Sequence, residues 1–137
     1  MAENRQTFRV SQKTEIDSVK RQIDFQIEKT DKEARITLQI QEDSKRVLNI
    51  SVYKTAVEES AENKYYKFTI NIDSALKNFR VELATEILDL TRIDFNWFTM
   101  PERTLAKLIE ERGLEYVVKQ FTMDLLIFIE TGVGIKQ

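Results

Sequence analysis

The stretch from residue 114 to 131, LEYVVKQFTMDLLIFIET, constrains the fold more than any other part of the sequence. At about 100° per residue, a helix here carries a wide apolar stripe formed by Leu114, Val117, Val118, Phe121, Leu125, Phe128 and Ile129. The opposite side carries a second, smaller apolar stripe of Tyr116, Met123 and Ile127. Because one apolar face is enough to pack on a core, a helix with two such faces is expected to contact two partners.

The length and composition are those of an ordinary globular chain. A chain of 137 residues predicts one α+β domain over 1–137, with loose termini at 1–6 and 133–137. With 42% hydrophobic and 32% charged residues, such a chain can bury a core without disulfides or metal. The net charge of -2 gives no sign of nucleic-acid binding driven by bulk charge.

The sequence contains neither histidine nor cysteine. Structural disulfides, thiolate catalysis and zinc sites built from these residues are therefore excluded. Any metal would need oxygen ligands, and we predict neither a metal site nor a cofactor. Asp124 and Glu130 interrupt the most apolar segment, and the N-terminal residues lack an apolar signal-like run. A cytoplasmic protein without a membrane partner is the expectation.

The N-terminal half alternates between apolar and polar residues, which is typical of strands with one buried face. The alternating apolar positions are Phe8, Val10; Ile23, Phe25, Ile27; Ala34, Ile36, Leu38, Ile40; Leu48, Ile50, Val52; and Tyr66, Phe68, Ile70, Ile72. Short polar loops at 30–33 and 42–45 separate the second, third and fourth of these strands. Short loops join antiparallel neighbours, so the pattern predicts a β-meander.

The segment 74–90 fits two patterns. Leu76, Phe79, Leu83, Ile87 and Leu90 follow helical spacing, whereas Phe79, Val81 and Leu83 also follow strand spacing. Its length and a capping residue at Asp73 or Ser74 favour a helix. Alternation returns in 92–98, RIDFNWF, and predicts one more strand there.

Two helices are predicted in the last third of the chain, over 102–112 and 114–131. The sequence TMPE at 99–102 has the form of a capping box, with Thr99 as the cap. Gly113 is placed to end the first helix in a left-handed conformation. The predicted fold is therefore α+β, an antiparallel meander sheet of five or six strands with three helices, mostly C-terminal, covering one face.

Catalytic candidates are few. Glu58, Glu59 and Glu62 share a polar loop, where a like-charged cluster is usually solvated, and Asp94 lies in an exposed polar row. All three glycines fall near the C-terminus, outside any phosphate-binding motif. We predict no catalytic residues.

The outward-facing positions of the predicted strands are mostly amides and hydroxyls rather than charges. Among them, Tyr53 and Tyr65 with Arg35 and Lys67 form a candidate platform on which single-stranded bases stack while the cations contact phosphates. The alternative interpretation is an ordinary solvated sheet face.

Three functional hypotheses follow. The first is a non-catalytic binding or assembly module that forms a homodimer through Tyr116, Met123 and Ile127 of the last helix. In an intramolecular alternative, these three residues pack under the N-terminal segment of the same chain. The second hypothesis is a protein that binds single-stranded nucleic acid, or another protein, through the polar sheet face. The third is an enzyme based on carboxylates.

Overall fold

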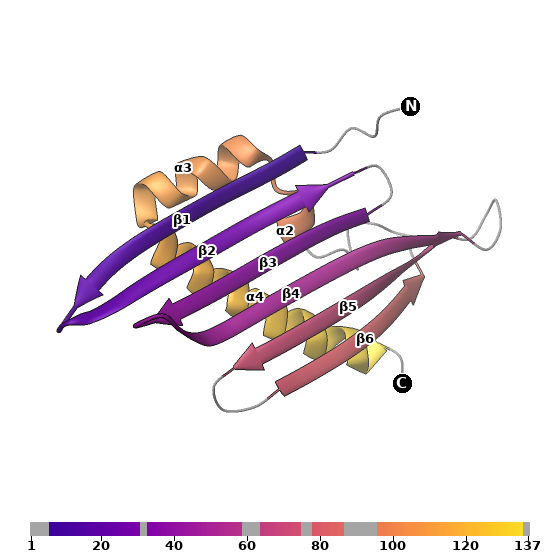
Figure 1. The fold of residues 1–137 in the computed structure, drawn as a ribbon. Helices are drawn as coiled ribbons and strands as arrows, with labels where there is room; N and C mark the ends of the chain where they lie inside the picture. The colour runs from indigo at the N-terminus through magenta and orange to yellow at the C-terminus, as the bar shows by residue number, and fades with distance from the viewer. Residues whose placement is uncertain (1–5, 31–32, 59–63, 75–77, 87–95, 136–137) are drawn as a thin grey trace.

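The computed structural model describes residues 6–30, 33–58, 64–74, 78–86 and 96–135, with the backbone alone at 56–58, 64–66, 78–86, 96, 99 and 131–135. Its centre is one antiparallel sheet whose six strands follow one another in chain order. The strands are β1 (Gln6–Ile16), β2 (Val19–Lys29), β3 (Glu33–Glu42), β4 (Lys45–Glu58), β5 (Lys64–Ser74) and β6 (Asn78–Glu86). The helices lie behind this sheet, and the longest crosses it diagonally (Figure 1).

Two tight turns set the register of β1 with β2 and of β3 with β4. Ile16 pairs with Val19 and Glu42 with Lys45, so each turn consists of two residues. The turn residues are Asp17-Ser18 and Asp43-Ser44, and all four have positive φ angles between 49° and 68°. Positive φ at both central residues is the type I′ geometry, whose twist matches that of the strands it joins.

The described helices are α2 (Asn96–Thr99), α3 (Glu102–Arg112) and α4 (Leu114–Ile135). Gly113 ends α3 with a positive φ of 90°, as predicted, but its ψ of 156° is extended rather than left-handed helical, and its N–H donates to the Ile109 carbonyl at 2.7 Å. The predicted capping box at Thr99 is wrong, because Pro101 is the residue that precedes α3 and no side chain caps the helix. Within the described chain, no helix is long and apolar enough to cross a membrane.

The core lies between the inner face of the sheet and α4. Phe25 of β2, Phe68 of β5 and Phe121 of α4 are fully buried in it. Trp97 of α2 also enters this core, with its ring edge-on to Phe121 at a centroid distance of 5.4 Å. Its indole N–H donates to Asp124 Oδ2 at 2.9 Å, which places one carboxylate of α4 against the core.

The predicted α+β class and antiparallel sheet are confirmed, whereas the helix predicted over 74–90 is wrong. Residue 74 ends β5, and Asn78–Glu86 forms β6. Phe79, Val81 and Leu83 pair with Ile72, Ile70 and Phe68, respectively, so strand alternation decided between the two patterns. Only α3 and α4 exceed a single helical turn in the described chain, rather than three helices as predicted.

Three boundaries also differ from the predictions. A strand was predicted over 92–98, but residues 96–98 belong to the helical turn α2, so the prediction is wrong there. Residues 92–95 lie outside the described chain. The last helix continues past Thr131 to Ile135. Of the termini predicted to be loose, Gln6 lies in β1 and residues 133–135 lie in α4, while 1–5 and 136–137 are outside the described residues.

Candidate interaction surfaces

The wide apolar stripe of α4 faces the sheet, as predicted. Six of its seven residues are buried, and the seventh, Phe128, is partly buried against the same core. The Phe128 ring meets Phe68 of β5 edge-on at 5.0 Å. The sheet therefore uses this whole face of α4, and any further contact must involve the other side of the helix.

The second stripe, Tyr116, Met123 and Ile127, is exposed; we call it the outer stripe. The exposed fractions of these residues are 39%, 48% and 59%, respectively. Leu126, beside the stripe, is 52% exposed. The sequence did not predict it as part of this surface, because it falls between the two stripes on a helical projection. Four large apolar side chains are thus exposed on this side of α4, and apolar patches on a protein surface often mark interaction sites.

The N-terminal segment does not cover the outer stripe in the described part of the chain. Residues 6–16 form β1, which pairs along its length with β2 at the edge of the sheet. Residues 1–5 lie outside the described chain. The intramolecular alternative thus finds no support from residue 6 onward.

A mostly apolar groove of about 450 Å³ runs beside the outer stripe, between α4 and the sheet. Ile40 of β3 and Leu48 of β4 line its sheet side, and Tyr116, Val118 and Met123 line its helix side. The outer stripe and the groove therefore share Tyr116 and Met123, and Arg21, Glu115, Lys119 and Thr122 complete the lining of the groove.

Arg21 fixes the start of α4 at one end of this groove. Its Nη1 lies 3.1 Å from Glu42 Oε2, and its Nε lies 2.7 Å from Glu115 Oε1. These two ion pairs join β2, β3 and the first turn of α4. A carboxylate in that first turn also interacts favourably with the helix dipole. Arg21 was not singled out from the sequence, because neither partner is near it in the chain.

The predicted platform on the outward sheet face is only partly assembled. Arg35 and Tyr53 are paired across β3 and β4, with the guanidinium 5.0 Å from the centre of the tyrosine ring. The Tyr53 hydroxyl donates to the Glu33 carboxylate. A shallow pocket of about 190 Å³ beside this ring is bordered by Glu28 and Glu33 as well as Arg35.

The other two platform residues lie on β5. Lys67 is exposed and pairs with Thr55, whereas Tyr65 pairs with Val57 and its side chain lies outside the described structure. The Tyr53 ring already contacts Arg35, and the carboxylates of Glu28 and Glu33 lie beside it. Negative charges at this position repel the phosphates of a nucleic acid. The nucleic-acid hypothesis stays a prediction, and this geometry does not favour it.

Several polar groups of the outward face bind one another. Gln22 Nε2 donates to Asp24 Oδ2 at 3.1 Å, Ser11 Oγ donates to the same carboxylate, and Gln26 donates to Glu28. The amide-rich composition noted in the sequence is therefore satisfied, in part, within the sheet.

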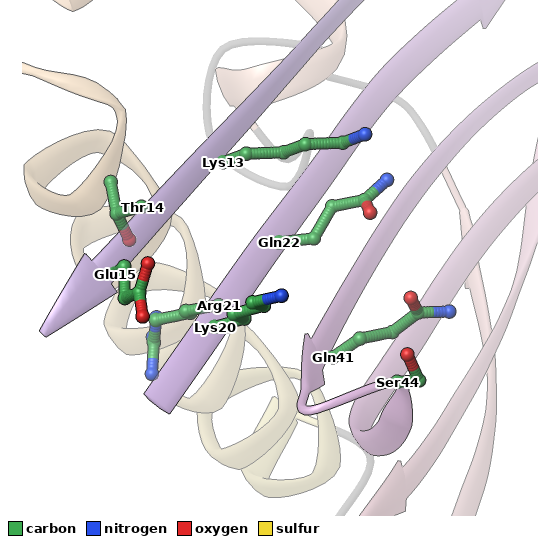
Figure 2. A pocket seen from close by; sticks show the side chains of 8 residues that line it. All are labelled: Lys13, Thr14, Glu15, Lys20, Arg21, Gln22, Gln41 and Ser44. Atoms are coloured by element: carbon green, nitrogen blue, oxygen red, sulfur yellow. The ribbon is translucent and has the colours of Figure 1, made fainter. Parts of the chain in front are cut away.

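A second hollow, of about 410 Å³, lies where β1, β2 and β3 approach their turns (Figure 2). Lys13, Gln22 and Gln41 extend from successive strands toward the same side, with Ser44 at the neighbouring turn. The side chains of Lys20, Arg21 and Glu15 also line the hollow. The hollow is therefore lined by charges of both signs and is open to solvent.

Within the described residues, no cluster of three or more acidic residues has the geometry to hold a metal ion. Glu59, Glu62 and Asp94 lie outside those residues, and the side chain of Glu58 is not described. The chain matches no protein-family model, and comparisons with curated proteins and with solved structures find no similar protein.

Proposed function

We propose that this chain is a non-catalytic assembly module that forms a homodimer through the outer stripe of α4. The exposure of Tyr116, Met123 and Ile127 on a helix whose other face is fully used carries this proposal. The adjoining groove supports it, because it offers a recess for apolar side chains of a second copy.

The charges around the outer stripe support an antiparallel crossing of two α4 helices. Such a crossing can set Tyr116 of one copy against Ile127 of the other. Arg112 is the last residue of α3 and lies beside Tyr116, and Glu130 lies about one turn after Ile127 on α4, so the same crossing brings these opposite charges near each other. Both residues are exposed, and the Arg112 guanidinium lies 5.2 Å from the Tyr116 ring.

The lack of histidine and cysteine supports a non-catalytic role, since it removes the commonest general base and the most nucleophilic side chain. Self-association through one face of a helix requires neither residue. A two-fold contact of this kind uses the same patch on both copies, which is the commonest arrangement in homo-oligomers.

Introducing glutamate at both Tyr116 and Ile127 is expected to halve the solution mass without unfolding the protein. Interface anchor residues contribute about 2 kcal/mol or more each, so losing two weakens the dimer roughly 1,000-fold or more. Light scattering after size-exclusion chromatography measures the mass, and circular dichroism checks the fold.

The matched control is Gln41→Glu with Asn71→Glu, which adds the same charge to the outward sheet face. We expect this variant to keep the wild-type mass. An unchanged mass in the Tyr116/Ile127 variant, or a loss of mass in the control as well, would contradict an α4 interface.

A further inference from the structure

The first strand of the sheet has one edge that no other strand occupies. β1 is the terminal strand in the order β1 to β6, and its eleven residues pair with β2 on one side only (Figure 1). Its pairing with β2 is continuous from Gln6 to Ile16, without a bulge, and the strand contains no proline. Bulges and prolines are two of the devices that stop such edges from pairing with other chains.

The two-residue turn determines which backbone groups point outward from this edge. Ile16 and Val19 flank the turn and form a hydrogen-bonded pair, so the even-numbered residues of β1 direct their N–H and C=O groups toward β2. The backbone groups of Thr7, Arg9, Ser11, Lys13 and Glu15 therefore point away from the sheet. They form a regular row of donors and acceptors that a further strand can use.

We propose that this edge pairs with β1 of a second copy, antiparallel and centred on Gln12, to form one continuous sheet across two subunits. In this register, Arg9 of one copy lies opposite Glu15 of the other, and Ser11 lies opposite Lys13. These are the outward-directed backbone groups, so they form the hydrogen-bonded pairs. The two opposite-charge pairs, one at each end, lie on the outer face of the joined sheet.

The neighbouring registers with the same hydrogen-bond pattern are less favourable. Shifting the second copy by two residues in one direction sets Arg9 opposite Lys13. Shifting it by two residues in the other direction sets Lys13 of one subunit opposite Lys13 of the other. Like charges directly opposite one another destabilise a strand pair, so charge selects the centre at Gln12.

The same register also brings apolar side chains together on the inner, core-facing side of the joined sheet. Phe8 of one copy then lies opposite Ile16 of the other. Ile16 is 66% exposed, which is the largest value among the exposed large apolar residues of the described chain, and Phe8 is partly buried against the core. Pairing these residues extends the apolar inner face across the junction and covers Ile16. An exposed isoleucine beside a turn thus gains a contact that the single chain does not provide.

This contact is independent of the α4 contact and uses a different element. A chain with two different two-fold contacts builds an assembly larger than a dimer, and four copies form the smallest closed one. We therefore expect a wild-type mass of four chains, reduced to two when either contact is lost and to one when both are lost.

Ser11→Pro tests the edge directly. The N–H of residue 11 is not used within the single chain, and edge strands tolerate proline there, but proline removes a donor and blocks close pairing. We expect Ser11→Pro to halve the solution mass both in the wild-type protein and in the Tyr116→Glu/Ile127→Glu variant. Ser11→Ala is the control, since it also loses the hydrogen bond to Asp24 but keeps the backbone N–H. It should leave the mass unchanged.

Charge reversal tests the register without altering the backbone. Glu15→Arg places like charges opposite each other and should weaken the pairing about tenfold or more, and Arg9→Glu combined with Glu15→Arg should restore it. The inference is overturned if Ser11→Pro leaves the mass unchanged, if Ser11→Ala lowers it equally, or if the double reversal does not recover the assembly. A wild-type protein of one chain would also overturn it.

Discussion

Phe121→Ala is expected to lower the free energy of unfolding by about 3–5 kcal/mol, the usual loss when a buried phenylalanine is truncated to alanine. The Phe121 side chain is fully buried. Its ring meets Phe25 edge-on at 5.4 Å and Trp97 edge-on at the same distance, so it joins α4 to β2 and α2. Truncation leaves a cavity at the meeting point of three elements, which limits how far the surroundings can close around it.

Urea unfolding in a background that carries Tyr116→Glu, Ile127→Glu and Ser11→Pro measures this loss without a contribution from dissociation of either the α4 or the β1 contact. Glu130→Ala is the control on the same helix, because Glu130 is exposed, and it should change the unfolding free energy by less than about 0.5 kcal/mol. A loss below about 1 kcal/mol for Phe121→Ala would mean that α4 does not face the sheet through this side.

The sheet could be predicted from the sequence wherever one face of a strand is buried. In β2 and β3 every second residue is buried, from Ile23 to Ile27 and from Ala34 to Ile40, so apolar alternation directly reports the core. In β6, Phe79 and Leu83 are four residues apart, a spacing that suits a helix as well as a strand. Only the pairing of these residues with β5 distinguishes the two, and that partner is a tertiary contact.

The two faces of α4 were predictable for a different reason. Helical geometry fixes the angle between residues, so the buried and exposed stripes follow from their spacing. Leu126 lies between the stripes, and whether such a residue is buried depends on how much of the helix the sheet covers. The width of that coverage is set by strand twist and crossing angle, which the residue pattern does not contain.

The polar sheet face shows why shared orientation alone does not define a site. Arg35 and Tyr53 were grouped from the sequence because both point outward. The register that sets them opposite each other depends on where β3 and β4 turn and on the irregularity at Ile40 and Gln41. In the structure the Arg35 guanidinium lies over the Tyr53 ring, so both groups already contact each other and the proposed stacking of bases on Tyr53 stays a prediction.

The position of β1 at an edge of the sheet depends on the complete topology. Alternation predicted a strand at Phe8 and Val10, but not its length of eleven residues or its place at the end of the sheet. A strand becomes an edge only when every other strand has found its partners. Only once β1 is known to be an edge strand can the charges of Arg9, Lys13 and Glu15 be related to a register of pairing with a second copy.

Trp97→Ala is expected to be the other strongly destabilising substitution, with a loss of about 3–5 kcal/mol. Trp97 is almost fully buried, and its N–H donates to Asp124 at 2.9 Å. It belongs to α2, a single turn of four residues, which is too short to be stable as an isolated helix. The indole therefore holds α2 against the core, and its removal should also expose the amides of this turn to rapid hydrogen exchange.

Two further variants separate the ring from its hydrogen bond. Trp97→Phe keeps an aromatic ring and loses the donor, so it should cost clearly less than Trp97→Ala. Asp124→Ala removes the acceptor and leaves the indole N–H without its partner, a loss of about 1–3 kcal/mol. If Asp124→Ala changes stability by less than about 0.5 kcal/mol, the bond contributes nothing. If it costs the expected amount, this carboxylate, which interrupts the most apolar stretch of the sequence, is there to bind the tryptophan that anchors α2.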